Sequence, residues 1–200
     1  MRLFIPCILL VSVSTGSASG QVKYFPDRAL SAQKRSDRFK SDWYSNQLQA
    51  LEEPSLWELS QSETERRESY RFLWLRTFQH PVAIRVDIEE SGAALLAVKV
   101  ASGAGGYAPG KLIRNENIAL TKEQCAHFLD IIEKNRFWEL PTLDESHIGM
   151  DGAQWVMEGV KDGKYHLVDR WSPGDGAIRT IGLALVKDFA KLKIPSKEIY

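Results

Sequence analysis

An acidic residue and a histidine near the C-terminus, Glu158 and His166, are the residues of this sequence best suited to chemistry. A carboxylate beside an imidazole can act as a general acid–base pair, or it can move the histidine pKa into a range where it switches near neutral pH. Both roles require the two side chains to be neighbours. The structural alternative is a solvated cross-strand charge pair, which contributes only about 0.2–1 kcal/mol to stability.

The turn of a hairpin expected over residues 153–171 decides whether this pair forms. A two-residue turn at Asp162-Gly163 would place Lys161 opposite Lys164 and mix polar and apolar groups on both faces. A three-residue loop that also includes Lys161, with the glycine left-handed in a bulge, pairs Val160 with Lys164 instead. This second register separates an apolar face from a polar one and brings the acid–base pair together. Because a slip of one residue exchanges the faces, we predict the second register.

Other polar residues of the hairpin are candidates for binding or support. On the predicted polar face Gln154 lies opposite Arg170, and we take both as candidate binding residues. Asp151 directly precedes the hairpin and is a candidate helper of the acid–base pair. Asp169 falls on the predicted apolar face, where an unpaired carboxylate is costly to bury. We expect Asp169 to be a structural anchor that meets an arginine, an indole N–H or a helix N-terminus.

Familiar metal, nucleotide and nucleophile motifs are missing from the sequence. The histidines are scattered, and neither HExxH nor G-x-S-x-G occurs. The glycine-rich segment 103–110 is followed by a strand pattern, whereas a phosphate cradle needs a helix N-terminus there. A loop between strands is therefore the better interpretation. We expect no metal ion and no cofactor.

The elements that position these residues pass from helices to strands and back. Residues 69–120 follow a period of two and predict a four-strand antiparallel meander. Thr121 opens a helix with a capping box that Gln124 completes, and a last helix is expected over about residues 176–192. Strands and helices segregated in this way indicate an α+β fold. We predict an antiparallel sheet, made of the four-strand meander plus the C-terminal hairpin, covered on one face by two main helices.

The N-terminal region divides into two segments ahead of this domain. Residues 1–20 have a basic residue, an apolar run and a tail of small residues, which is typical of a signal peptide. The apolar run, Leu3–Val13, is well short of the ~20 residues that cross a bilayer as a helix, although an uncleaved anchor remains the alternative. Residues 21–68 read as a polar lead-in with a short helix beginning near Ser41. Residues 69–200 form the single α+β domain.

Composition excludes several classes of protein. Apolar residues make up 44% of the 200 residues and charged residues 26%, which is typical of globular chains and not of disordered or coiled-coil proteins. The 26 basic residues balance 26 acidic ones. A nucleic-acid-binding domain usually carries a basic excess, so we expect no nucleic-acid partner. After removal of the signal peptide we expect no stable membrane span.

The hairpin sequence also supports a resemblance. The segment DGAQWVMEGVKDGKYHLVDRWSP at 151–173, with FWELP at 137–141, resembles an uncharacterised family of exported bacterial proteins. This family shares a DG-x-x-W-x-x-E … YH-x-x-x-RWSP hairpin, and the resemblance runs from about Tyr70 to the C-terminus. It implies a single domain in a bacterial, periplasmic or secreted protein. It implies no activity, cofactor or catalytic residue.

Two functions follow from these observations. The leading hypothesis is a non-catalytic periplasmic or secreted module that binds another envelope or secreted protein, or an envelope component. Trp43, Trp57 and Tyr107 lie in segments expected to stay partly exposed, where aromatic side chains can anchor a partner. The alternative is a hydrolytic enzyme that uses Glu158 and His166. A carrier of a lipid or small ligand is a third hypothesis, which requires an apolar cavity between sheet and helices.

Overall fold

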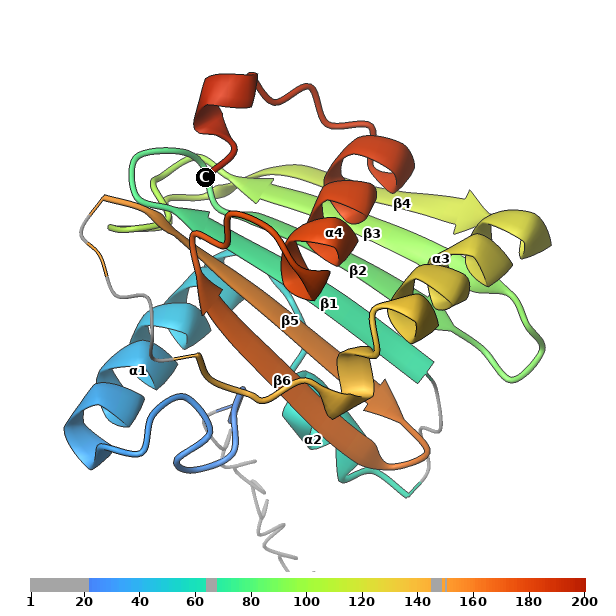
Figure 1. The fold of residues 1–200 in the computed structure, drawn as a ribbon, viewed down its shortest axis with the longest axis horizontal. Coiled ribbons are helices and arrows are strands. Elements are labelled where there is room, and N and C mark those ends of the chain that lie inside the picture. The colour runs from blue at the N-terminus through green and yellow to red at the C-terminus, as the bar shows by residue number, and fades with distance from the viewer. Residues whose placement is uncertain (1–21, 64–67, 145–148, 150) are drawn as a thin grey trace, which may run out of the picture.

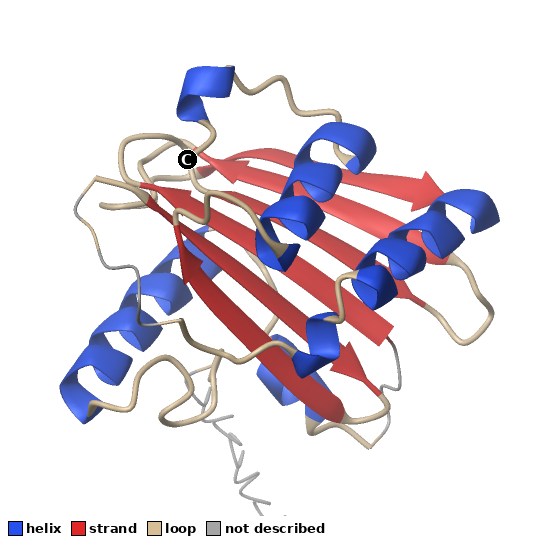
Figure 2. Ribbon diagram, viewed as in Figure 1, coloured by secondary structure: helices blue, strands red, loops and turns tan. Residues whose placement is uncertain are grey.

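A six-stranded antiparallel sheet is the centre of the computed structural model, which describes residues 22–63, 68–144, 149 and 151–200. The signal peptide predicted over residues 1–20 lies outside the described residues. The strand order is β4-β3-β2-β1-β5-β6, so the hairpin adds to the free side of the first meander strand (Figure 2). The strands are β1 Glu68–Arg76, β2 Val82–Ile88, β3 Ala94–Ala101, β4 Leu112–Leu120, β5 Ala153–Lys161 and β6 Lys164–Trp171. The predicted α+β class and the meander-plus-hairpin sheet are confirmed.

Helices lie on both faces of this sheet. Figure 1 shows α3 and α4 in front of the sheet and α1 and α2 behind it. We call these the near face and the far face. The two main helices predicted to cover one face of the sheet are α3 and α4, and they lie on the same face. The helices α1 and α2 also cover the other face, which the sequence did not predict. The helices are α1 Lys34–Ala50, α2 Leu56–Ser60, α3 Lys122–Lys134 and α4 Ala177–Leu183, which a π-helical turn continues over Ala184–Phe189.

The near face holds the larger part of the core. The rings of Phe72 and Trp74 on β1 lie 5.3 and 5.1 Å from that of Trp155 on β5. Gly182 of α4 lies directly over them, because a Cβ built there would be 2.8 Å from both Phe72 and Trp155. This glycine therefore sets how closely α4 packs on the sheet. The predicted capping box of Thr121 begins α3 and is confirmed.

The N-terminal segment packs on the far face. Tyr44, Leu48 and Leu51 are fully buried against far-face residues of β1, β2 and β5. The helix that carries them begins at Lys34, seven residues before the predicted start at Ser41. The carboxylate of Asp37 in its first turn accepts backbone N–H groups of the preceding loop, and these bonds fix the earlier start. The lead-in sequence therefore supplies one layer of the fold.

The hairpin turn has two residues, so the predicted three-residue register is wrong. Lys161 pairs with Lys164 across a turn whose two residues, Asp162 and Gly163, have φ of 51° and 72°. Positive φ at both positions defines the turn that best matches strand twist, and Asp-Gly is a preferred sequence for it. The lysine pair costs little because both residues are exposed, and Lys161 also pairs with Glu68. The preference of Asp-Gly for a two-residue turn therefore outweighs the separation of polar and apolar side chains onto opposite faces of the hairpin.

Candidate functional site

The predicted acid–base pair does not form. Glu158 pairs with Leu167 and projects to the far face, whereas His166 pairs with Gly159 and projects to the near face. The sheet therefore separates the two side chains. The contact between Glu158 and His166 that a hydrolytic enzyme would use was expected only in the three-residue register, so it is absent from the observed one.

Glu158 belongs instead to a buried ionic cluster on the far face. Its Oε2 accepts hydrogen bonds from Nε and Nη2 of Arg71 at 2.8 and 2.5 Å, and its Oε1 accepts the Tyr165 hydroxyl at 2.9 Å. Both charged side chains are fully buried. Burial raises the pKa of Glu158, and the charge of Arg71 opposes that rise. A carboxylate so enclosed and paired has no route to a substrate.

The cluster extends to Glu53, in the connection between α1 and α2. Its carboxylate lies 2.9 Å from Arg85 Nε, 3.2 Å from Lys99 Nζ and 3.6 Å from Arg71 Nη1. These cations come from three neighbouring strands, β2, β3 and β1. The same connection receives two further bonds through its backbone, from Arg71 and from Lys99. The Glu53 cluster, made of Glu53, Arg71, Arg85, Lys99 and Glu158, therefore fastens the N-terminal segment to the sheet.

His166 is enclosed by aromatic rings on the near face. Its ring lies 5.0 Å from that of Phe137 and 5.9 Å from that of Trp138. Burial lowers the pKa of His166, and backbone groups of Phe137 and Leu140 oppose the shift. The neutral imidazole thus serves as a packing residue beneath the 3₁₀ turn at Phe137–Glu139.

A cavity between α1 and the β5–β6 hairpin contains the strongest candidate site. Its volume is about 670 Å³. Asp169 lies in its lining, with Oδ2 2.8 Å from Lys40 Nζ and 3.1 Å from the Tyr44 hydroxyl. Asp169 was expected to anchor on an arginine, an indole or a helix N-terminus; its partners are instead a lysine and a tyrosine of α1. We call this cavity the Asp169 pocket, lined among others by Phe39, Lys40, Trp43, Gln154, Asp169 and Trp171.

Two residues of the pocket lining each have a buried acceptor atom that lacks a hydrogen-bond partner and that water cannot reach. Within the described part of the chain, Asp169 Oδ1 and Gln154 Oε1 are both buried and unpaired. The parent residues are 3% and 7% exposed. They lie on adjacent strands of the far face, since Asp169 pairs with Val156 and Gln154 pairs with Trp171. Burial raises the pKa of Asp169, and Lys40 opposes that shift.

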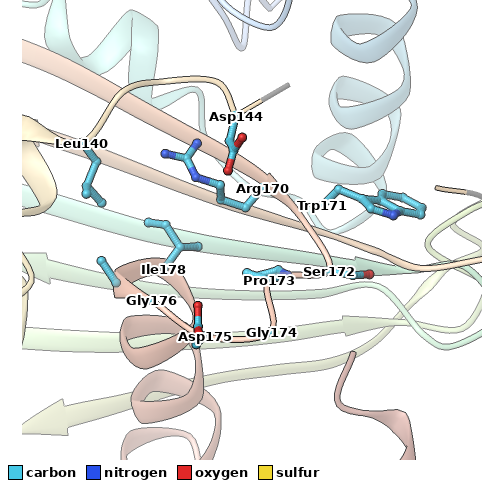
Figure 3. A pocket seen from close by; sticks show the side chains of 11 residues that line it. Leu140, Asp144, Arg170, Trp171, Ser172, Pro173, Gly174, Asp175, Gly176 and Ile178 are labelled. Carbon is cyan, nitrogen blue, oxygen red and sulfur yellow. The ribbon is translucent and has the colours of Figure 1, made fainter. Parts of the chain in front are cut away.

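The predicted binding residue Arg170 lies on the opposite face and lines a neighbouring pocket of about 460 Å³. Figure 3 shows its guanidinium beside Asp144, across the pocket from Ile178 of α4. Arg170 donates to the carbonyls of Pro141, Thr142 and its own neighbour in the chain. Among the described residues lining this second pocket, no buried side-chain atom lacks a partner. Arg170 therefore holds the loop after α3 against β6.

The three predicted aromatic anchors lie in different surroundings. Trp43 lines the Asp169 pocket and donates its indole N–H to the Gly105 carbonyl at 2.8 Å. Trp57 is half-buried and packs edge-on against Tyr165, 5.5 Å between ring centroids. Tyr107 is 63% exposed at the tip of the glycine-rich loop. Trp43 and Gln154 are thus the predicted binding residues that the structure brings to one cavity.

Phe39 and Lys40 of α1 also line this cavity, and neither was predicted as a binding residue. Phe39 and Trp43 are four residues apart, as are Lys40 and Tyr44, so each pair lies on one side of the helix. That spacing is a signal the sequence contains. It was overlooked because the helix was expected to begin near Ser41.

Comparisons with known proteins do not assign this chain to a family. No family model matches the chain, and no curated protein matches it in sequence. Among the described residues, none of the helices is long and apolar enough to pass through a bilayer.

Proposed function

We propose that the protein is a non-catalytic binding protein of the periplasm or the secreted fraction, and that its ligand site is the Asp169 pocket. The observation that carries this proposal is the cavity of about 670 Å³ between α1 and the β5–β6 hairpin, which Phe39, Trp43 and Trp171 line.

The shape and position of the pocket support the same conclusion. Its volume falls within the ~300–1,000 Å³ typical of small-molecule sites, and aromatic side chains line it beside a few polar groups. The cavity lies between sheet and helix, as a small-ligand carrier requires. The targeting pattern of residues 1–20 supports export. The hydrolytic alternative lacks its acid–base pair, because the sheet separates Glu158 from His166.

Filling the pocket tests the proposal. Ser36 lies on α1 in the pocket lining, and Ser36→Trp places a bulky side chain there. Ser41, equally half-buried on the same helix, lies outside this lining, so Ser41→Trp is the matched control. The purified full chain is incubated with the low-molecular-weight fraction of a bacterial envelope extract and analysed by native mass spectrometry.

A small molecule should remain bound to the wild type and to Ser41→Trp. Its occupancy should fall about tenfold or more in Ser36→Trp, equivalent to at least ~1.4 kcal/mol. The proposal is wrong if the wild type retains no small molecule, or if Ser36→Trp binds it as well as the control does.

A further inference from the structure

We infer that β4 is the surface through which two copies of this chain associate, by antiparallel pairing of their β4 strands around a twofold axis at Asn115. This surface lies at the opposite edge of the sheet from the β5–β6 hairpin, so the inference is independent of the Asp169 pocket. Figure 1 shows β4 as the outermost strand on its side of the sheet. The outer side of such a strand carries backbone N–H and C=O groups that can pair with a further strand.

The two edges of the sheet differ in their protection. On β6, Leu143 forms a bridge to Asp169, and the Asp169 backbone N–H donates to the Thr142 carbonyl. Within the described residues, no segment pairs in this way with the outer side of β4. β4 has nine residues and no proline, and the five consecutive residues Asn115–Ala119 are all exposed. It is therefore a long edge strand without the usual steric barriers to pairing.

Two charged residues of β4 decide which strand can pair with it. Arg114 and Glu116 lie opposite Val100 and Val98 of β3, so both project to the near face. Arg114 Nη2 lies 2.7 Å from Glu116 Oε2, and the two side chains are 33% and 49% exposed. Charges on an edge strand oppose pairing with a strand of arbitrary sequence, because like charges then meet directly. The partner strand must present the same two charges in the reverse order.

A second copy of β4 supplies that order. A twofold axis normal to the sheet keeps the near faces together and places one residue opposite its own copy. With Asn115 on the axis, Arg114 lies opposite Glu116 of the second copy, and Glu116 lies opposite the second copy's arginine. The two intrastrand pairs and the two cross-strand pairs then form a ring of four alternating charges. An axis at Arg114 or Glu116 would oppose like charges, and one at Asn117 would place Glu116 opposite Ile118.

The neighbouring side chains suit the same register. Ile113 and Ile118 are 59% and 38% exposed beside the charged residues, and a second strand covers part of both. The two Asn115 side chains lie opposite each other, where their amides can exchange hydrogen bonds. The paired segment is short, about five to seven residues per strand, so we expect a weak dimer with a Kd of roughly 10–100 µM.

Sedimentation velocity of the purified full chain, at concentrations from about 1 to 200 µM, tests this association. We expect a reversible monomer–dimer equilibrium in the wild type. Arg114→Glu and Glu116→Arg each place like charges opposite one another, and each should weaken the dimer about tenfold or more. Lys134→Glu is the matched control, because it reverses one charge of the exposed Lys134–Asp130 pair on α3 and should leave the Kd unchanged.

Two combinations restore the complementary charges and identify the register. The double variant Arg114→Glu/Glu116→Arg exchanges the two charges and should dimerise within about threefold of the wild type. A mixture of the two single variants places an acidic strand opposite a basic one, so it should form a heterodimer more tightly than either variant associates with itself. Either recovery excludes misfolding as the reason that the single variants dissociate.

Three results overturn the inference. A wild type that stays monomeric to about 200 µM has no such dimer, and the open edge is then left for a strand of another protein. A dimer that both single charge reversals leave unchanged forms elsewhere on the molecule. Single variants whose association is restored neither by the exchange nor by the mixture do not meet in the Asn115 register.

Discussion

Replacement of Arg71 by methionine tests whether the Glu53 cluster holds the N-terminal segment to the sheet. Arg71 is fully buried, donates twice to Glu158 and once to the Pro54 carbonyl, and lies 3.6 Å from Glu53. Removing one partner of a buried ion pair costs about 3–5 kcal/mol. Glu53 retains Arg85 and Lys99, so most of the loss falls on Glu158, which keeps only the Tyr165 hydroxyl among these contacts.

Urea denaturation followed by tryptophan fluorescence measures this loss. We expect Arg71→Met to lower the free energy of unfolding by about 3–5 kcal/mol, or the thermal midpoint by roughly 6–20 °C. The double variant Arg71→Met/Glu158→Gln should recover about 2 kcal/mol, because it no longer buries an uncompensated charge. Arg38→Met is the matched control; Arg38 pairs with Asp42 in an exposed contact of 3.8 Å, and its loss should cost under about 0.5 kcal/mol.

The pH dependence of Arg71→Met supplies a second measurement. Without the arginine, the pKa of the buried Glu158 carboxyl rises further above its ordinary value of 4.5. A carboxyl with a raised folded-state pKa contributes stability below its unfolded pKa and loses it as pH rises through the folded pKa. Arg71→Met should therefore be closest to wild type near pH 5 and furthest from it near pH 8. A loss below about 1 kcal/mol, or a double variant as unstable as the single one, would refute the reasoning.

Two further substitutions test the hairpin and the near face. Gly163→Ala should lower the free energy of unfolding by about 1–2 kcal/mol because the residue has φ of 72°. The control is Gly174→Ala, where a built Cβ meets nothing within 4 Å; it should cost under about 0.5 kcal/mol in the same urea titration. Equal effects of the two substitutions would contradict the two-residue turn. His166 should titrate by NMR below its ordinary pKa of 6.5, so the stability that it contributes is complete above pH 6.5 and is lost as pH falls through the lowered value. His166→Gln should remove that part of the acid sensitivity, and a His166 that titrates at or above 6.5 contradicts its burial.

The strands, the capping box and the sheet class were predictable because their signals are local. The alternation in β2 and the Thr121 box at the start of α3 depend on residues a few positions apart. The register of the hairpin was predicted wrongly. We assumed that one face of the hairpin meets water, whereas both faces are covered, so polar and apolar residues mix on each. The cation that compensates Glu158 is Arg71, 87 residues earlier in the chain.

The candidate site was predictable in part. Gln154 and Trp43 were singled out as binding residues, but their shared cavity depends on α1 packing against β5 and β6. Asp169 was recognised as a costly carboxylate that needs a partner. Its partners, Lys40 and Tyr44, are 129 and 125 residues away, and no local pattern identifies contacts at such separation.

The strand order has a consequence for the order in which the chain folds. β1 is hydrogen-bonded to β2 on one side and to β5 on the other, so the meander formed first leaves one side of β1 open. Such an open edge is a template for pairing with another chain. As the chain emerges N-terminus first into the compartment where it folds, this edge stays unpaired until α3 and the loop that follows have also emerged. The edge is covered only once β5, which ends at Lys161, has emerged, about four fifths of the way along the chain.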